Sequence, residues 1–152
     1  MDKKIQELID KAQTQAKGVT FLNTPDQLKS FYLDGLNVYK EWRALASIED
    51  WLPVDQDFLQ DFRIKLNEKK IDIRVIFKKS GLKFEPENLE HRHVKIIPDS
   101  YTFRSSIDIL DDKILIMNPH LSVLGIVIEG EALIDVFIDM FDLLWASLPE
   151  TK

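Results

Sequence analysis

The strongest constraint on the fold is a strand–helix–strand pattern over residues 40–77. The segment IDIRVIF at residues 71–77 interleaves charged and apolar side chains and predicts a strand. A helix is predicted before it, beginning with acidic residues at 55–57 and ending at the lysines of 69–70. Residues 40–47 fit an extended helix or a strand, and the helix that follows favours the strand. Two strands joined through a helix predict a parallel pair with a crossover connection.

The C-terminal half predicts further strands and a long closing helix. Strand patterns lie at residues 94–99, 102–110, 113–118 and 121–130, and the last three are the most apolar, so we expect them near the sheet centre. The segment from Glu131 to Pro149 has apolar side chains around most of a helical surface, which predicts a helix that packs on the sheet and against a second subunit. The order of elements indicates an α/β fold, a mixed sheet flanked by helices.

The N-terminal residues predict a helix, a short strand and a second helix. Residues 1–18 carry a narrow apolar stripe at helical spacing, which predicts a linker or coiled-coil helix, with an ordinary surface helix as the alternative. Residues 19–23 have a strand pattern. Thr24 then begins a helix, and Gln27 completes a capping box with it. We therefore expect one domain over residues 19–150.

Composition and charge exclude several classes of function. The chain of 152 residues has no cysteine, which excludes disulfides, thiolate metal sites and a cysteine nucleophile. Its net charge of −6 disfavours a broad nucleic-acid surface. No segment approaches the roughly 18 apolar residues of a membrane span, and the N-terminus lacks the apolar core of a signal peptide. We expect a cytoplasmic protein without a cofactor or a membrane partner.

Several segments together resemble one known family. They are EWRALASIEDW, IDIRVIF, VKIIPD, SSIDILDDKILIMN, LSVLGIVIEG and DVFIDMFDLLWASL. Over about residues 19–148 the chain resembles the effector-sensing domain of TrmB-type transcriptional regulators, whose fold is similar to one half of phospholipase D. The resemblance implies a ligand-sensing domain that forms a homodimer. It also implies that DNA is read by a winged helix-turn-helix domain, which this chain lacks, with residues 1–18 in place of the connecting helix.

The resemblance to phospholipase D bears on catalysis. That superfamily uses a His-x-Lys-x(4)-Asp motif, in which the histidine attacks phosphorus and the lysine neutralises the phosphoryl oxygens. Placing the aspartate of the motif on Asp111 puts Arg104 and Ser106 at the histidine and lysine positions. A shift of one residue puts Ser105 and Ile107 there instead. Neither alignment supplies a nucleophilic imidazole, so we expect that the protein is not an enzyme.

A ligand pocket is expected at the strand ends, where the catalytic groups would otherwise lie. Sugar sites combine an aromatic face with charged or amide groups, and residues of these types occur in this region, so the predicted effector is a sugar or sugar phosphate. Each residue also has a purely structural interpretation, as core packing for the tryptophans and as ion pairing for Arg104. The predicted ligand-binding residues are Trp42, Arg43, Arg104, Ser106, Asp108 and Asn118, with Trp51 as a further lining residue.

The histidines offer a weak alternative site. His91 and His93, spaced by two, could bind a divalent ion together with Glu90 or Glu87. Two imidazoles without a firm third ligand are typical of a solvated strand start, so no metal site is predicted.

Two other functions remain open from the sequence. The first is an interaction or dimerisation module without a small-molecule ligand, which predicts a filled cleft at residues 104–106 and an apolar interface on the last helix. The second is a phosphodiesterase-like or other hydrolase. No serine lies in the glycine-flanked turn that exposes a hydrolase nucleophile, and adjacent aspartates usually form turns. The residues that such an enzyme would use are Ser105, Ser106, Asp108, Asp111, Asp112 and His120.

Overall fold

The computed structural model describes residues 2–15, 18–51, 53, 55–85, 89–118 and 124–150. The strands are β1 Val19–Leu22, β2 Glu41–Ala46, β3 Asp72–Lys78, β4 Arg92–Ile97, β5 Ser106–Ile109, β6 Ile114–Met117 and β7 Gly125–Ile128. The helices are α1 Lys3–Gln15, α2 Pro25–Gly35, α3 Ile48–Trp51, α4 Gln56–Glu68, the 3-10 helix η2 Lys79–Phe84, and α5 Glu131–Ser147.

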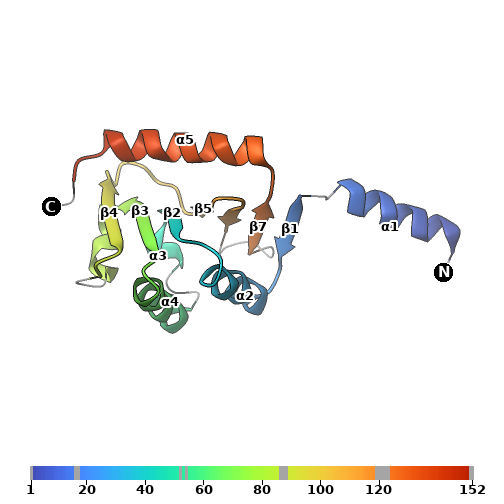
Figure 1. Ribbon diagram of the computed structural model, residues 1–152, viewed down its shortest axis with the longest axis horizontal. Coiled ribbons are helices and arrows are strands. Elements are labelled where there is room, and N and C mark those ends of the chain that lie inside the picture. The colour runs from blue at the N-terminus through green and yellow to red at the C-terminus, as the bar shows by residue number, and fades with distance from the viewer. Residues whose placement is uncertain are drawn as a thin grey trace.

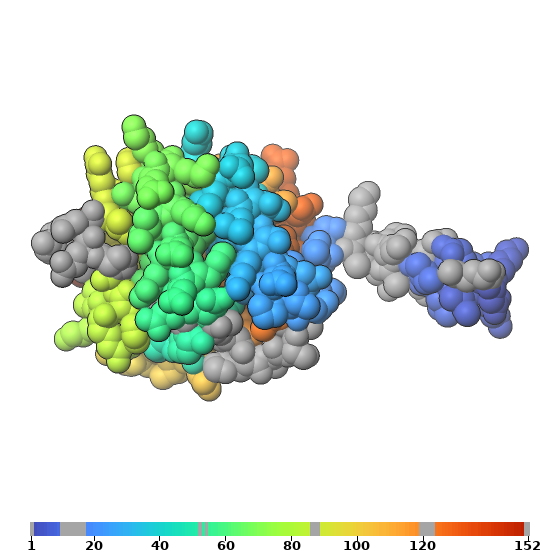
Figure 2. All heavy atoms as spheres, turned by 90° about the horizontal axis from the view of Figure 1, so that it is seen from below, coloured from blue at the N-terminus to red at the C-terminus, as the bar shows by residue number. Residues whose placement is uncertain are grey.

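In this described part of the chain, seven strands form one mixed sheet in the order β1-β7-β6-β5-β2-β3-β4. Helices α2 and α4 lie on one face of the sheet, and α5 runs across the other (Figure 1). Figure 2 shows the first of these faces, where the side chains of α2 and α4 form the outer layer. The predicted α/β fold with a mixed sheet flanked by helices is therefore confirmed.

Strands β2 and β3 form the parallel pair that the sequence predicts. Glu41 lies opposite Asp72, and Ala46 lies opposite Phe77. Strand β3 also pairs in parallel with β4, whereas the pairs that involve β5, β6, β7 and β1 are antiparallel. Helix α4 connects β2 to β3 across one face, and the assignment of residues 40–47 to a strand is confirmed.

The prediction for the sheet centre is only partly correct. Strand β5 is central, but β7 lies next to the edge strand β1, with Val19 opposite Ile128. An apolar strand indicates that both of its faces are buried under other parts of the protein. A strand next to the edge of a sheet can be buried in this way too. The apolar pattern of β7 therefore did not fix its position in the sheet.

Each face of the sheet has its own apolar layer. Trp42, Leu66 and Ile73 belong to the layer beneath α2 and α4, while Ile76 and Phe141 belong to the layer beneath α5. Burial of a side chain of this size stabilises the fold by about 1.5–3 kcal/mol. Successive side chains of β2 and β3 point to opposite faces of the sheet, so helices are needed on both faces to cover them.

Side chains cap the start of α2 and the end of α5. The Thr24 Oγ1 atom accepts a hydrogen bond from the Gln27 N–H at 3.2 Å, and the Gln27 side chain accepts one from the Thr24 N–H, as predicted. At the far end of the chain, the buried Lys95 Nζ donates to the carbonyl oxygens of Trp145 and Leu148 at 2.8 and 3.0 Å. The positive charge of Lys95 also lies at the negative end of the α5 dipole, which is a favourable interaction.

The sequence did not predict α3 or η2. Both are too short for helical periodicity to stand out from the surrounding loops. Helix α1 projects away from the sheet, and its apolar residues Ile5, Leu8 and Ile9 are exposed (Figure 1). Among the described helices, none is long and apolar enough to cross a membrane.

Candidate functional site: a cavity between the sheet and helices α2 to α4

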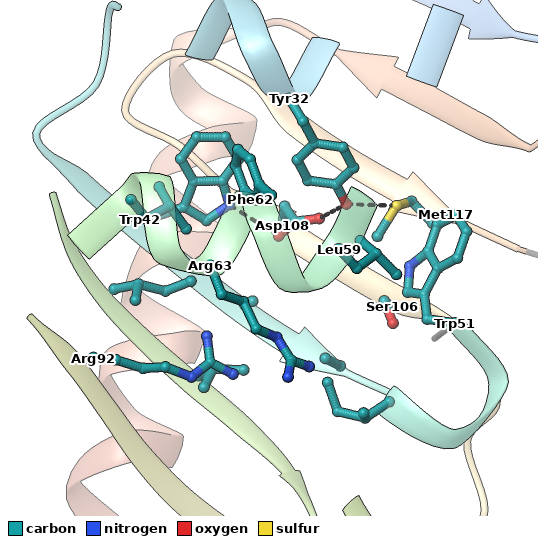
Figure 3. Close-up of a pocket in the computed structure, with 16 residues that line it drawn as sticks. Tyr32, Trp42, Trp51, Leu59, Phe62, Arg63, Arg92, Ser106, Asp108 and Met117 are labelled. Carbon is teal, nitrogen blue, oxygen red and sulfur yellow. Dashed lines mark hydrogen bonds between the residues drawn. The ribbon is translucent and has the colours of Figure 1, made fainter. Parts of the chain in front are cut away.

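A cavity of about 80 Å³ lies between the sheet and the three helices α2, α3 and α4 (Figure 3). The space exists because the central strand β2 presents two small side chains, Ala44 and Ala46, to this face. Larger side chains surround them. The other lining residues are Tyr32, Trp42, Ile48, Trp51, Leu59, Phe62, Arg63, Leu66, Ile73, Val75, Arg92, Ser106, Asp108 and Met117.

One wall of the cavity holds a buried carboxylate. The Trp42 Nε1 atom donates to Asp108 Oδ1 at 2.9 Å, and the Tyr32 hydroxyl donates to Asp108 Oδ2 at 2.8 Å. Burial raises the pKa of Asp108 to about 6, against the two hydrogen bonds, which lower it. Burial and the nearby Asp108 carboxylate raise the pKa of Tyr32 well above its usual value, so Tyr32 remains a donor.

Trp51 and Arg63 are two further polar groups of the lining. The Trp51 Nε1 atom is buried without a hydrogen-bond partner among the described residues. Arg63 is 8% exposed, donates to the Phe84 carbonyl oxygen at 2.7 Å, and forms no ion pair within the described ranges. Burial, with a smaller contribution from Arg92, lowers the pKa of Arg63 to about 10 against the effect of Glu85, so the guanidinium stays charged at neutral pH.

Arg92, the other arginine of the lining, is paired with a carboxylate. Arg92 Nε and Nη2 lie 2.6 and 2.9 Å from the two carboxylate oxygens of Glu85, so its charge is neutralised. Figure 3 shows Arg63 and Arg92 at one end of the cavity and Trp51 with Ser106 at the other. One end of the cavity is therefore cationic, and the other end contains the Trp51 N–H, which has no hydrogen-bond partner among the described residues.

The carboxyl ends of β2 and β3 carry a separate polar cluster. Ser106 Oγ accepts the Ser47 N–H at 2.9 Å, which fixes the start of β5 against the end of β2. Beyond it, Lys78 pairs with Glu49 at 3.2 Å, and Arg104 Nε pairs with an Asp50 oxygen, also at 3.2 Å. These charges neutralise one another at the surface, so this cluster leaves no buried group without a partner comparable to Arg63.

Comparisons with known proteins rest on structure alone, because no family model and no curated protein matches the sequence. TrmBL2, described as an archaeal chromatin protein with a novel mode of DNA binding, has a TM-score of 0.60 at 14% identity over 98% of this chain. NucT from Helicobacter pylori has a TM-score of 0.57 at 8% identity, over 87% of this chain and 98% of NucT. Nuc from Salmonella typhimurium, a phospholipase D family member, has a TM-score of 0.56 at 9% identity, over 88% of this chain and 97% of Nuc.

The fold is similar to the phospholipase D fold. At these identities the likeness concerns the fold alone, and the chain spans 62% of the length of TrmBL2. The expected motif region contains a strand, a turn and a strand, but the first strand is shorter than predicted: Ser106 begins β5, Arg104 lies two residues before it, and Asp111 lies in the turn before β6.

The structure brings together three of the six predicted ligand-binding residues. Trp42, Ser106 and Asp108 line the cavity, as does Trp51. Arg43 points to the opposite face of the sheet, where it pairs with Glu41 and Asp111. Arg104 is largely exposed in the strand-end cluster, and Asn118 follows β6; neither lines the cavity.

The sequence interpretation missed Tyr32 and Arg63. Arg63 did carry a signal, because it lies four residues after Leu59 and three before Leu66, within the apolar stripe of α4. A charged residue at such a position is either paired or functional. Tyr32 carried no comparable signal, since an aromatic residue on an apolar helix face is usually core.

The histidines show no metal cluster. His91 Nδ1 lies 3.0 Å from an Asp72 oxygen, and the described residues contain no group of three metal-ligating side chains. Glu87 and His120 lie outside the described residues. A His-x-Lys tripeptide does occur at residues 93–95, but it belongs to β4, and Lys95 caps α5 on the other face of the sheet.

Proposed function

We propose that this chain is a non-catalytic, effector-binding and dimerising domain of a TrmB-like transcriptional regulator, and that the effector binds in the cavity beneath α2 to α4. The observation that carries the proposal is a formed cavity in which, among the described residues, the buried Trp51 N–H has no partner and the buried Arg63 has no counter-ion. A cavity with a few polar groups among apolar walls is the usual form of a small-molecule site.

The absence of catalysis is part of the proposal. In the alignment with the phospholipase D motif, Arg104 stands at the position of the nucleophile and Ser106 at the position of the lysine. Ser106 Oγ already accepts a backbone hydrogen bond from Ser47, so it has a structural role. A serine does not carry the positive charge that stabilises a phosphoryl transition state.

The regulatory setting follows from the likeness to TrmBL2 and from charge. A net charge of −6 does not favour direct contact with phosphates, so DNA would be read by a helix-turn-helix domain outside this sequence, in the cytoplasm. Helix α1 would connect the two domains. Effector binding would shift the placement of two subunits, and α1 would transmit the shift.

Ligand screening by thermal denaturation tests the proposal. The full chain is heated with sugars, sugar phosphates, nucleotides, carboxylates and amines, and binding is expected to raise the melting temperature for at least one class. The sugar or sugar phosphate remains the prediction from sequence. A chromogenic phosphodiester assay is run in parallel, and turnover above background would contradict the non-catalytic assignment.

A second function, a dimerisation module without a ligand, is favoured by one observation. Helix α5 carries four exposed apolar side chains at helical spacing, Leu133, Val136, Met140 and Leu143. They form a stripe on the side of α5 that does not contact the sheet. If no ligand class raises the melting temperature while the chain dimerises through this stripe, this second function replaces the first.

A further inference from the structure

The unused groups in the cavity specify the charge of its ligand. Trp51 Nε1 can only donate a hydrogen bond, and a guanidinium offers donors and no acceptor. Trp51 therefore requires an acceptor atom, and Arg63, which forms no ion pair among the described residues, favours a negative charge beside it. A planar anion can accept two parallel hydrogen bonds from a guanidinium.

The carboxylate of Asp108 does not satisfy this requirement within the protein. Its two oxygens accept hydrogen bonds from Tyr32 and Trp42, and it forms no ion pair with Arg63 among the described contacts. Glu85, whose charge acts on Arg63, is engaged by Arg92 through both of its oxygens. Among the described residues no carboxylate forms an ion pair with Arg63, so its positive charge is open to neutralisation by a ligand.

The walls specify the rest of the ligand. Ala44, Ala46, Leu59 and Val75 form an apolar surface beside the arginines, and they contribute no hydrogen-bonding side chain. The volume of about 80 Å³ admits a short body rather than a phosphorylated sugar. A compact apolar group with one anionic end fits both the walls and the charge.

We infer that the cavity binds a small monocarboxylate with a branched or aromatic apolar body, whose carboxylate contacts Arg63. This inference rests on the proposed function and names the chemical class of its effector. The alternative ligand is an amine, whose positive charge would interact with the Asp108 carboxylate and with the surrounding aromatic rings. The amine would have to displace the hydrogen bonds of Tyr32 and Trp42, and it would share the cavity with an unneutralised arginine.

The test uses the full chain and four probes: benzoate and isovalerate as carboxylates, benzamide as the neutral match, and benzylamine as the cation. Thermal denaturation and isothermal titration calorimetry are expected to show binding of the carboxylates and little binding of the amide or the amine. Arg63→Gln is expected to weaken carboxylate binding by about ten- to hundredfold, the effect of losing one charge-assisted contact.

Two further variants make the result specific. Arg63→Lys keeps the charge and is expected to restore part of the binding if Arg63→Gln proves poorly folded. Lys65→Gln removes an exposed charge from the same helix and is expected to leave binding unchanged.

The outcomes separate this inference from the proposed function. Binding of the amine, the amide or a sugar without binding of either carboxylate overturns the inference and leaves an effector-binding domain. No binding by any class overturns both. Carboxylate binding that is equal in Arg63→Gln and the unaltered chain places the anion elsewhere and also overturns the inference.

Discussion

The indole nitrogen of Trp42 donates to the Asp108 carboxylate at 2.9 Å, beneath two helices and away from solvent. This contact joins neighbouring strands β2 and β5 on the face that forms the cavity. Asp108 is 6% exposed, and its second oxygen is held by Tyr32. The buried acid therefore couples the stability of the fold to pH.

Removing this acid should flatten the pH dependence of stability. The pKa of Asp108 is about 6 in the folded state and about 3.8 in the unfolded chain, so the folded state binds its proton more tightly. Its stabilising contribution is complete below about pH 3.8 and is lost as pH rises through 6, by about 3 kcal/mol in total. Asp108→Asn does not titrate in this range. Urea unfolding of both proteins between pH 4 and 7.5 checks the difference, and parallel curves would contradict it.

The cap on α5 should contribute measurably to stability. Lys95 donates to two carbonyl oxygens at the end of α5, and its Nζ lies 4.8 Å from the centre of the Trp145 ring. Lys95→Met keeps the length of the side chain but leaves the carbonyls without this donor. We expect a loss of about 2–4 kcal/mol in the free energy of unfolding. Lys79→Met, at an exposed lysine, is the matched control and should change stability little; an equal loss in both variants would argue against the cap.

Local chemistry explains which parts of the fold were predictable. The capping box at Thr24, the parallel pair around α4 and the long helix α5 each follow from residues close together in sequence. The place of β7 beside β1 depends on residues about a hundred positions apart, and no local pattern encodes that pairing. The position of such a strand in the sheet is decided by its contacts with residues that are distant in sequence.

The candidate site was predicted in part for the same reason. Alternation along β2 and β5 places Trp42, Ser106 and Asp108 on one face, and the same rule places Arg43 on the other. Grouping Arg43 with Trp42 ignored that alternation. Arg63 comes from a helix that crosses above the strands, so its arrival at the cavity required the three-dimensional structure.

Filling the cavity should separate ligand binding from folding. Ala44→Val adds two methyl groups in a central strand, where a β-branched residue is favourable. We expect stability to stay within about 1 kcal/mol of the unaltered chain, since the new atoms occupy existing space. Ligand-induced stabilisation should disappear. Thermal denaturation with the best ligand from the screen measures this, and Thr20→Val on the edge strand β1 is the control. Full retention of ligand stabilisation in Ala44→Val would place the ligand outside the cavity.

The α5 stripe should control self-association. Leu143 is 74% exposed and Met140 is 60% exposed, and both lie on the side of α5 away from the sheet. Burying such side chains against a second copy would be favourable, whereas a carboxylate at the same place would carry an unpaired charge into the interface. Leu143→Glu is therefore expected to convert a dimer to a monomer in light scattering after size-exclusion chromatography.

A control variant and a salt series complete the test of the stripe. Val38→Glu changes an apolar residue with 65% exposure that lies outside α5, and it should leave the dimer intact. Helix α5 carries acidic side chains and no basic ones over residues 131–147, so two copies repel each other electrostatically. Salt screens this repulsion, and the dimer should strengthen between low and moderate ionic strength. Dimerisation that weakens with salt, or that survives Leu143→Glu, would place the interface on a different surface.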